Sequence, residues 1–413
     1  MLAEIITIGD ELLNGQTIDT NSAWVARRLN EAGISINRIA SVSDKESHIL
    51  SALHDAWNRV SLVIMTGGLG PTSDDITKTS LAKFFKTEMV FSREVYDRVE
   101  ALLALRGLPV NEVNKSQAWI PENSRLINNR LGTAPGLWFE ENGKVVIALP
   151  GVPYEMEDII NREIIPALQS SFKLGAIRHR TILTYGTYEA RLAEMLADFE
   201  KNLPSVVKLA YLPASGVIRL RLSTAGSDAA SAVSLLDSLQ ASLEQVVGEY
   251  VFGYDDDTLE KVVGDLLRNK HCSLSTAESC TGGTVAHLIT SVPGSSDYFA
   301  GSVVAYSNYI KEKILDVPAE DLAMHGAVSR EVVESMAIGV KKLLQTDYAV
   351  ATSGIAGPDG GTAEKAVGLV WIAVAGPVSL RSEKFMFGKS RTQNIRRASL
   401  TALNMLRKII LQQ

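Results

Sequence analysis

Short apolar runs alternate with amphipathic stretches over residues 1–172. The apolar runs are rich in Ile and Val, which is typical of buried strands. They are Leu2–Ile8, Ile34–Val42, Leu62–Met65 and Val145–Leu149. Apolar residues recur with helical spacing at Asn21–Glu31, Ser47–Arg59, Asp75–Phe85, Glu94–Arg106 and Tyr154–Phe172. This alternation predicts a largely parallel sheet with helices on both faces.

Residues 173–252 form a shorter stretch with a different order of elements. The pattern predicts strand, helix, strand, strand and helix at Thr181–Tyr185, Tyr188–Phe199, Val206–Leu212, Val217–Ser223 and Ala229–Val247. The two middle strands flank a turn at Pro213–Gly216. We see no catalytic cluster there, so a structural or dimerising α+β module is expected.

Residues 253–413 return to alternating strands and helices. Strands are predicted near Ser273–Thr276, Tyr298–Tyr306, Tyr348–Ser353, Leu369–Ala375 and Glu383–Phe387. The long helices are Ser329–Leu344 and Thr392–Ile410. The predicted fold class is therefore α/β, with two three-layer α/β domains of mainly parallel sheets joined by the small α+β module.

The composition changes this picture little but excludes several classes of protein. Of the 413 residues, 46% are hydrophobic and 21% charged, and the net charge is −6 without a Lys/Arg-rich tract. Nucleic acid is therefore an improbable partner, and so is an anionic membrane. Cys272 and Cys280 are the two cysteines, which favours a reducing compartment. With no basic leader and no long apolar run, we expect a cytoplasmic protein.

The segment Thr276–Gly283 carries the clearest chemical signal. It lies between a predicted strand and a predicted helix, so Ser279 is expected at a strand-to-helix turn, beside backbone N–H groups that no helix carbonyl reaches. Such groups can stabilise negative charge that develops on a substrate. The same residue types are also typical of a helix cap followed by a tight turn.

Two further loops follow strands of the same predicted sheet, and open α/β sheets bind ligands at this edge. One is Tyr306–Lys311 and the other is Ser353–Gly361. A serine needs a base, and Lys311 can serve if burial lowers its pKa. Lys311 is equally compatible with a solvated first helical turn, and Tyr306 with an ordinary strand aromatic.

These motifs resemble the CinA C-terminal family, the nicotinamide mononucleotide (NMN) deamidases, over roughly Leu259 to the C-terminus. The resemblance implies hydrolysis of the NMN carboxamide to nicotinate mononucleotide and ammonia, without a cofactor. Ser279 would be the nucleophile and Lys311 the general base, with Tyr306 between them or positioning the proton. The residues expected to bind substrate are Glu278, Cys280, Thr281, Gly282, Gly283, Ser353, Gly354, Arg391 and Arg396. Of these, Arg391 and Arg396 are candidates for the phosphate.

Acidic and glycine residues also follow three strands of the N-terminal stretch. The loop Thr66–Asp75 contains Gly67, Gly68, Gly70 and Asp74 and is suited to cradling a phosphate or a pterin. Carboxylates at separate strand ends can converge on Mg²⁺ or Mn²⁺, although each is also typical of an N-cap or a turn. The candidate ligands are Glu11, Asp44 and Asp75, with Asp10 and Asp74 behind them.

The N-terminal motifs resemble the MoaB/MogA/MoeA molybdopterin-binding domain in its CinA version, over roughly the first 170 residues. The resemblance implies an ADP-ribose pyrophosphatase that uses a divalent metal, Mg, Mn or Co. It also implies a KH-like module in the middle stretch and a homodimer. Two alternatives stay open: a non-catalytic competence or DNA-damage partner, linked to a recombinase by the family name only, and an N-terminal domain that only binds a pterin.

Overall fold

The computed structural model describes residues 1–412 except 106, 173, 215, 227 and 228. The predicted helix end at Arg106, the predicted module start at Lys173, the turn residue Ser215 and the terminal Gln413 lie outside the described residues. The chain forms two compact units, which are Met1–Arg178 with Thr224–Leu235 and His179–Ser223 with Leu236–Gln413.

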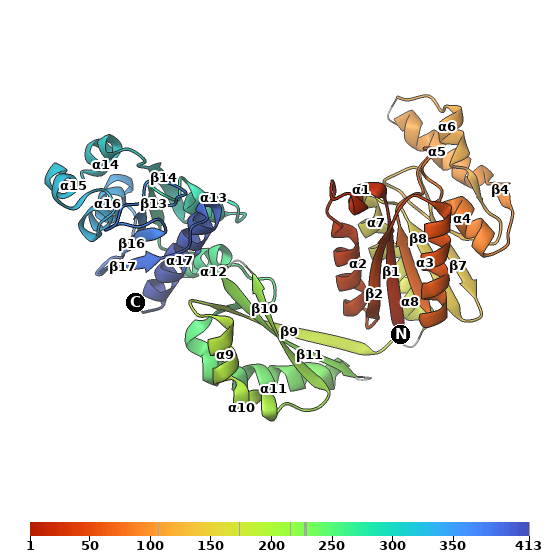
Figure 1. The fold of residues 1–413 in the computed structure, drawn as a ribbon, viewed down its shortest axis with the longest axis horizontal. Coiled ribbons are helices and arrows are strands. Elements are labelled where there is room, and N and C mark those ends of the chain that lie inside the picture. The colour runs from red at the N-terminus through yellow and green to blue at the C-terminus, as the bar shows by residue number, and fades with distance from the viewer. Residues whose placement is uncertain (106, 173, 215, 227–228, 413) are drawn as a thin grey trace. The chain divides into compact units, whose positions relative to one another are not determined.

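The first unit is built on a six-stranded sheet of order β2-β1-β3-β8-β7-β6 (Figure 1). Its strands are β1 (Leu2–Ile8), β2 (Ser35–Val42), β3 (Leu62–Thr66), β6 (Arg125–Ile127), β7 (Gly136–Glu141) and β8 (Lys144–Leu149). β2, β1, β3 and β8 are parallel, as predicted. β7 and β6 add an antiparallel edge that we did not predict, because β6 is too short to give a pattern.

Helices cover both faces of this sheet, since successive β1 residues point to opposite sides. Ile5 packs with α2 (Thr20–Glu31), α7 (Pro153–Ile159), a π-helical turn at Ile160–Ile164 and α8 (Ile165–Ser171). Ile6 packs with α3 (Glu46–Arg59), α4 (Thr77–Phe84) and α5 (Arg93–Leu105). The smaller elements are α1 (Asp10–Leu13), α6 (Glu112–Ser116), β4 (Met89–Phe91) and β5 (Trp119–Pro121).

The small α+β module has a four-stranded sheet of order β10-β11-β9-β12. Its strands are β9 (Ala176–Tyr185), β10 (Val207–Ala214), β11 (Val217–Gly226) and β12 (Val251–Tyr254). The helices are α9 (Glu189–Met195), α10 (Ala197–Lys201) and α11 (Ala229–Val247). Leu220 and Leu222 are buried whereas Arg219 and Arg221 are exposed, so β11 has one wet face.

The C-terminal sheet has the order β14-β13-β15-β16-β17. Its strands are β13 (Leu274–Glu278), β14 (Phe299–Val304), β15 (Tyr348–Gly354), β16 (Leu369–Ala375) and β17 (Leu380–Met386). β14, β13 and β15 are parallel neighbours, so their carboxyl ends meet at one edge. β16 pairs antiparallel with β15, and β17 pairs antiparallel with β16. The predicted parallel pairing therefore holds for β14, β13 and β15, and the other half of the strand pairings in this sheet are antiparallel.

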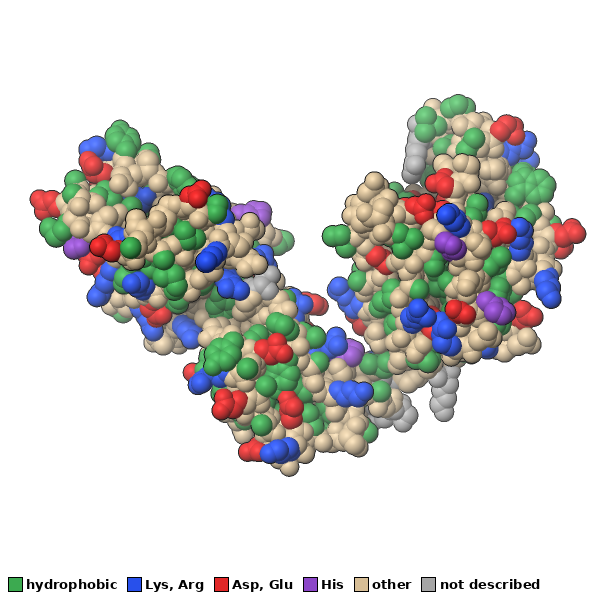
Figure 2. Space-filling model, viewed as in Figure 1, with side chains coloured by type: hydrophobic (Ala, Val, Ile, Leu, Met, Phe, Trp, Pro, Cys, Tyr) green, Lys and Arg blue, Asp and Glu red, His purple; other side chains and the backbone are tan. Residues whose placement is uncertain are grey.

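Helices pack on both faces of the C-terminal sheet. One face carries α12 (Leu259–Asn269), α13 (Thr284–Thr290) and α17 (Arg391–Gln412). The other carries α14 (Asn308–Leu315), α15 (Ala319–His325) and α16 (Arg330–Leu344). None of the described helices is both long and apolar enough to cross a bilayer. Acidic and basic side chains are interspersed over the visible face of each unit (Figure 2).

Candidate functional site

Ser279 and Lys311 meet directly at the carboxyl edge of the C-terminal sheet. Ser279 follows β13, while Lys311 lies in the first turn of α14, whose N-terminus is capped by the Ser307 hydroxyl. The Lys311 Nζ atom lies 3.1 Å from the Ser279 Oγ atom. The parallel register of β13 and β14 brings these two loops together, although 32 residues separate them in the sequence.

The surroundings of Lys311 favour a neutral amine. The side chain is 1% exposed, and burial lowers its pKa from the ordinary value of 10.5. Its other neighbours are the Ala305 carbonyl at 2.7 Å and the Tyr306 carbonyl at 3.4 Å. Among the described residues, no carboxylate forms an ion pair with it. Lys311 Nζ donates to these two carbonyls and to Ser279 Oγ; in the neutral form, which burial favours, it can instead accept the Ser279 hydrogen bond while still donating to both carbonyls.

The Tyr306 side chain does not lie between Ser279 and Lys311, so that expectation is wrong. The side chain is 61% exposed, and its hydroxyl accepts a hydrogen bond of 3.2 Å from Arg391. Arg391 also donates to the Gly357 carbonyl at 2.9 Å. The backbone carbonyl of Tyr306 faces the amine whereas the ring faces solvent. Tyr306 and Arg391 therefore connect the second and third loops at the rim of the site.

Glu278 is a helix cap and not a substrate ligand, which corrects a second expectation. The side chain is fully buried, and its carboxylate accepts hydrogen bonds from the Gly283, Val285 and Ala286 N–H groups at 2.8–3.1 Å. The Thr281 hydroxyl donates to the same carboxylate at 2.6 Å. A negative charge satisfies the otherwise unpaired donors of the first turn of α13. Those three N–H groups are therefore unavailable to a substrate.

The turn after Ser279 leaves two other donors open. Within the described part of the chain, no hydrogen bond to an oxygen uses the backbone N–H groups of Cys280 or Thr281, and the Cys280 N–H interacts only with its own thiol. Gly282 and Gly283 have φ values of 61° and 98°, which favour glycine. A Cβ at Gly282 would meet nothing within 4 Å, so the space in front of the turn is open. This turn can stabilise an oxyanion.

The Cys280 thiol is unsuited to be the nucleophile. It is 7% exposed, and burial raises its pKa to about 12. The thiolate would therefore be scarce at neutral pH.

The third loop is held by side chains that do not face an open site. Ser353 is 1% exposed and donates to the Ala327 carbonyl at 2.6 Å, while a Cβ at Gly354 would lie 2.6 Å from the Leu369 carbonyl. Both residues were expected to bind substrate, but the structure gives them positioning roles. Asn394, which sequence reasoning missed, is 1% exposed and donates to the Ala356 and Gly388 carbonyls at 2.9 Å each. The only signal for Asn394 in the sequence was that a polar residue falls on the apolar face of the last predicted helix.

Arg391 and Arg396 lie on different sides of α17. Arg391 reaches the third loop, as its contact with Gly357 shows. Arg396 lines a hollow against the small module, together with Thr187 and Tyr188. At 100° per residue, five positions rotate a side chain by about 140° around a helix. Arg396 therefore does not reach the third loop beside Arg391, and Arg391 is left as the candidate for the phosphate.

The N-terminal acidic residues gather only in part. The backbone N–H of Asp10 donates to the Asp44 carboxylate at 2.9 Å. Burial raises the pKa of Asp44 despite that hydrogen bond, and the nearby carboxylates of Asp10, Glu11 and Asp74 add to the rise. Asp75 instead accepts hydrogen bonds from the backbone N–H and the hydroxyl of Thr72. Among the described residues, no three His, Cys, Asp or Glu side chains are placed to hold a metal ion, so Glu11, Asp44 and Asp75 do not form a ready-made site.

The glycine loop packs against the end of β1. Gly67 and Gly68 have φ values of 107° and 65°, and a Cβ at Gly67 would lie 2.3 Å from the Ile8 carbonyl. Gly70 lies against the Asp75 carboxylate, where a Cβ would be 2.5 Å away. Gly67 lines a small cavity of about 140 Å³ together with Glu11 and Asn21. Glu11 and this loop therefore share a concave surface.

Comparisons with known proteins agree with this architecture. Three family models match: "Probable molybdopterin binding domain" over residues 4–170, "Damage-inducible protein CinA KH domain" over 179–253 and "CinA C-terminal domain" over 256–410. A CinA-like protein of Cytophaga hutchinsonii is 49% identical, with 98% of this chain and 97% of that protein aligned. A CinA-like protein of Flavobacterium psychrophilum is 44% identical, with 100% of this chain and 99% of that protein aligned. A crystal structure of a CinA superfamily protein from Klebsiella pneumoniae is 32% identical, with a TM-score of 0.37, and covers 38% of this chain and 97% of that one.

Fold and comparisons together define a class of protein in which a MoaB-like α/β domain and a second α/β domain flank a KH-like module. With relatives 44–49% identical over nearly the whole length, the chain belongs to the CinA family.

Proposed function

We propose that the C-terminal domain hydrolyses the carboxamide of NMN, giving nicotinate mononucleotide and ammonia. The observation that carries the proposal is the 3.1 Å contact between the Ser279 hydroxyl and the buried Lys311 amine. A serine next to a neutral amine can attack a carbonyl carbon. The choice of NMN as the substrate rests on the resemblance of the surrounding loops to the CinA C-terminal family.

In the first half-reaction, Ser279 Oγ attacks the carboxamide carbon as its proton passes to Lys311 Nζ. The oxyanion receives hydrogen bonds from the open N–H groups of the Cys280–Thr281 turn. The C–N bond then breaks, and the leaving nitrogen takes the proton from Lys311 and departs as ammonia. An ester of nicotinate mononucleotide remains on Ser279.

In the second half-reaction, water attacks the ester carbon and gives one proton to Lys311. The bond to Ser279 breaks, and Ser279 Oγ recovers the proton. In this proposal Arg391 holds the nucleotide phosphate, because its guanidinium lies at the rim of the same site. No step needs a metal.

The test is release of ammonia from NMN by the purified full-length chain, measured with and without a chelator. Activity that survives chelation and disappears in Ser279→Ala is the expected result, with Cys280→Ala as the adjacent control. A folded chain that releases no ammonia would refute the proposal and favour a non-catalytic partner protein. Loss of activity in Cys280→Ala alone would move the nucleophile to the thiol.

We also propose that the N-terminal domain cleaves the pyrophosphate of ADP-ribose with a divalent metal. Burial raises the pKa of Asp44, and the nearby carboxylates of Asp10, Glu11 and Asp74 raise it further; a cation bound there would offset their mutual repulsion, which supports this activity. Mg²⁺ often uses only one or two carboxylates and completes its shell with substrate phosphates and waters, which fits an incomplete protein ligand set. In this proposal Glu11 and Asp44 would hold the metal, which would supply Lewis-acid polarisation of the phosphoryl group.

Formation of AMP from ADP-ribose in the presence of Mg²⁺, Mn²⁺ or Co²⁺ tests this second activity. Glu11→Gln is expected to abolish it, whereas Glu31→Gln, on the exposed surface of α2, is the matched control. If the folded wild-type chain forms no AMP with any of these metals, the domain is better described as a pterin binder.

A further inference from the structure

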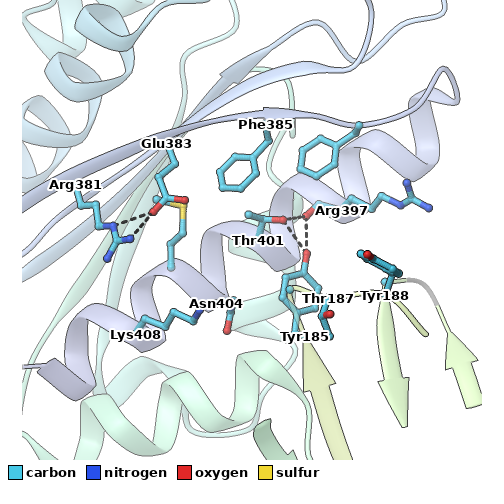
Figure 3. Close-up of a pocket in the computed structure, with 14 residues that line it drawn as sticks. Tyr185, Thr187, Tyr188, Arg381, Glu383, Phe385, Arg397, Thr401, Asn404 and Lys408 are labelled. Carbon is cyan, nitrogen blue, oxygen red and sulfur yellow. Dashed lines mark hydrogen bonds and ion pairs between the residues drawn. The ribbon is translucent and has the colours of Figure 1, made fainter. Parts of the chain in front are cut away.

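A second cavity, of about 490 Å³, lies within the second unit between the KH-like module and the C-terminal domain (Figure 3). Its walls come from one face of β17, one face of α17 and the turn after β9. The cavity adjoins the hollow that contains Arg396, because the two share Thr187, Tyr188 and Arg397 among their lining residues. Neither Ser279 nor Lys311 lines it, and its size is that of a small-molecule site.

One wall is a flat aromatic platform. Phe385 and Phe387 are two residues apart at the end of β17, so their side chains share a face. Their ring planes are nearly parallel, at 7°, and their centroids lie 5.9 Å apart. Both rings are only partly buried. Two parallel rings on one wall offer a larger stacking surface than a single ring does, which favours a fused bicyclic base.

The end of the cavity near the start of α17 is positive. Arg396 and Arg397 are adjacent and exposed, and among the described residues neither forms an ion pair. The opposite end contains Arg381, which is paired with Glu383 at 2.8 Å. Arg397 lines the cavity, whereas Arg396 lies about 100° further around α17 and lines the adjoining hollow, so Arg397 supplies the unpaired guanidinium that favours a phosphate here.

Two polar groups on the walls have no partner in the described part of the chain. Asn404 is 6% exposed, and its Oδ1 accepts from Arg407 at 3.2 Å while its Nδ2 donates to nothing. The Thr187 Oγ1 atom is buried and likewise makes no hydrogen bond. The Thr187 hydroxyl is therefore unsatisfied in a buried position, where polar groups are usually paired, and the Asn404 amide N–H group is a free donor for a ligand with hydrogen-bonding edges.

We propose that this cavity binds a purine nucleoside monophosphate, with the base on Phe385 and Phe387 and the phosphate at Arg397. Asn404 and Thr187 then bond to the polar edge of the base or to the ribose. The site is separate from the Ser279 site and does not depend on the deamidase proposal.

The test is isothermal titration of the full-length chain with AMP, comparing Arg397→Gln and Phe385→Leu with wild type. We expect each variant to weaken AMP binding at least about tenfold. Lys384→Gln, on the other face of β17, and Ser279→Ala should bind AMP as tightly as wild type. Circular dichroism of each variant checks that it is folded.

Three further ligands test the chemistry. Adenosine lacks the phosphate, NMN has a single-ring base and inorganic phosphate has no base, so all three should bind at least about tenfold more weakly than AMP. Absence of AMP binding, or unchanged AMP affinity in both Arg397→Gln and Phe385→Leu, would overturn the proposal. Equal affinity for inorganic phosphate and AMP would do so as well, because the aromatic platform would then contribute nothing.

Discussion

Replacing Lys311 with Met is expected to remove deamidation while leaving the fold intact. Met has nearly the same length and fills the same buried space, but it cannot take the proton of Ser279. A positioned general base contributes about 10²- to 10⁴-fold to a rate, which corresponds to about 3–5 kcal/mol in the activation barrier. We therefore expect kcat to fall by at least about 10².

The stability of the same variant should change much less. Lys311→Met loses hydrogen bonds to the Ala305 and Tyr306 carbonyls, each worth about 0.5–1.5 kcal/mol net. It also relieves the unfavourable burial of an amine that is 1% exposed. These two effects oppose each other, so urea unfolding should shift by no more than about 2 kcal/mol. Lys313→Met, an exposed position on the same helix, is the control for both assays.

The pH profile separates a base from a merely structural lysine. Burial lowers the pKa of Lys311 below 10.5, and the neutral form is the active one. Wild-type kcat/KM should therefore rise with pH as the amine loses its proton, with the midpoint of the rise below pH 10.5. Lys311→Arg stays charged at every accessible pH and should be as inactive as Lys311→Met. A Lys311→Met variant within tenfold of wild type, with the same rise, would refute the reasoning.

Three further predictions follow from single buried groups. Glu278→Gln should lower the free energy of unfolding by about 2–4 kcal/mol, because the single amide oxygen cannot accept hydrogen bonds from all three N–H groups that donate to the carboxylate. A urea midpoint equal to that of wild type would contradict the capping role. Asn394→Ala should lower kcat/KM for NMN by about tenfold or more through loss of its hold on the third loop, and unchanged kinetics would show that the loop is held without it. Burial lowers the pKa of Lys78 from 10.5 to about 8. As the pH rises, the native chain therefore loses this proton at a lower pH than the unfolded chain does. The free energy of unfolding should rise by about 3 kcal/mol between pH 8 and 10.5 as a result. Lys78→Met should abolish that rise, and parallel unfolding curves for the two proteins across this range would argue against it.

The contact between Ser279 and Lys311 is the part of the site that sequence reasoning reached. The apolar runs identified β13, β14 and β15, and the chemistry-bearing residues follow directly after them. Parallel neighbouring strands end at one edge, so Ser279 and Lys311 were expected to approach each other. The 3.1 Å contact agrees with that expectation.

The errors concern the directions of side chains. Glu278 stands next to Ser279 in the sequence, yet its carboxylate turns under the N-terminus of α13 because the Gly282–Gly283 turn presents unpaired N–H groups to it. The side chain of Tyr306 points outward while its carbonyl points inward. Arg396 lies about 140° around α17 from Arg391. The presence of these residues in the motifs did not indicate in which direction each side chain would point.

The sequence by itself determined the order of strands and helices, the position of the reactive loops at strand ends and the residue types that the chemistry needs. These properties are local, since hydrophobic periodicity and glycine positions are written within a few residues. Only the tertiary structure decided which polar groups are shielded from water, which form hydrogen bonds and which remain unpaired. It buried Lys311 without an ion pair among the described residues, satisfied Glu278 with backbone donors and left the Thr187 hydroxyl unpaired beside an aromatic wall. Burial and pairing depend on contacts between segments far apart in the chain, and those contacts exist only once the chain has packed.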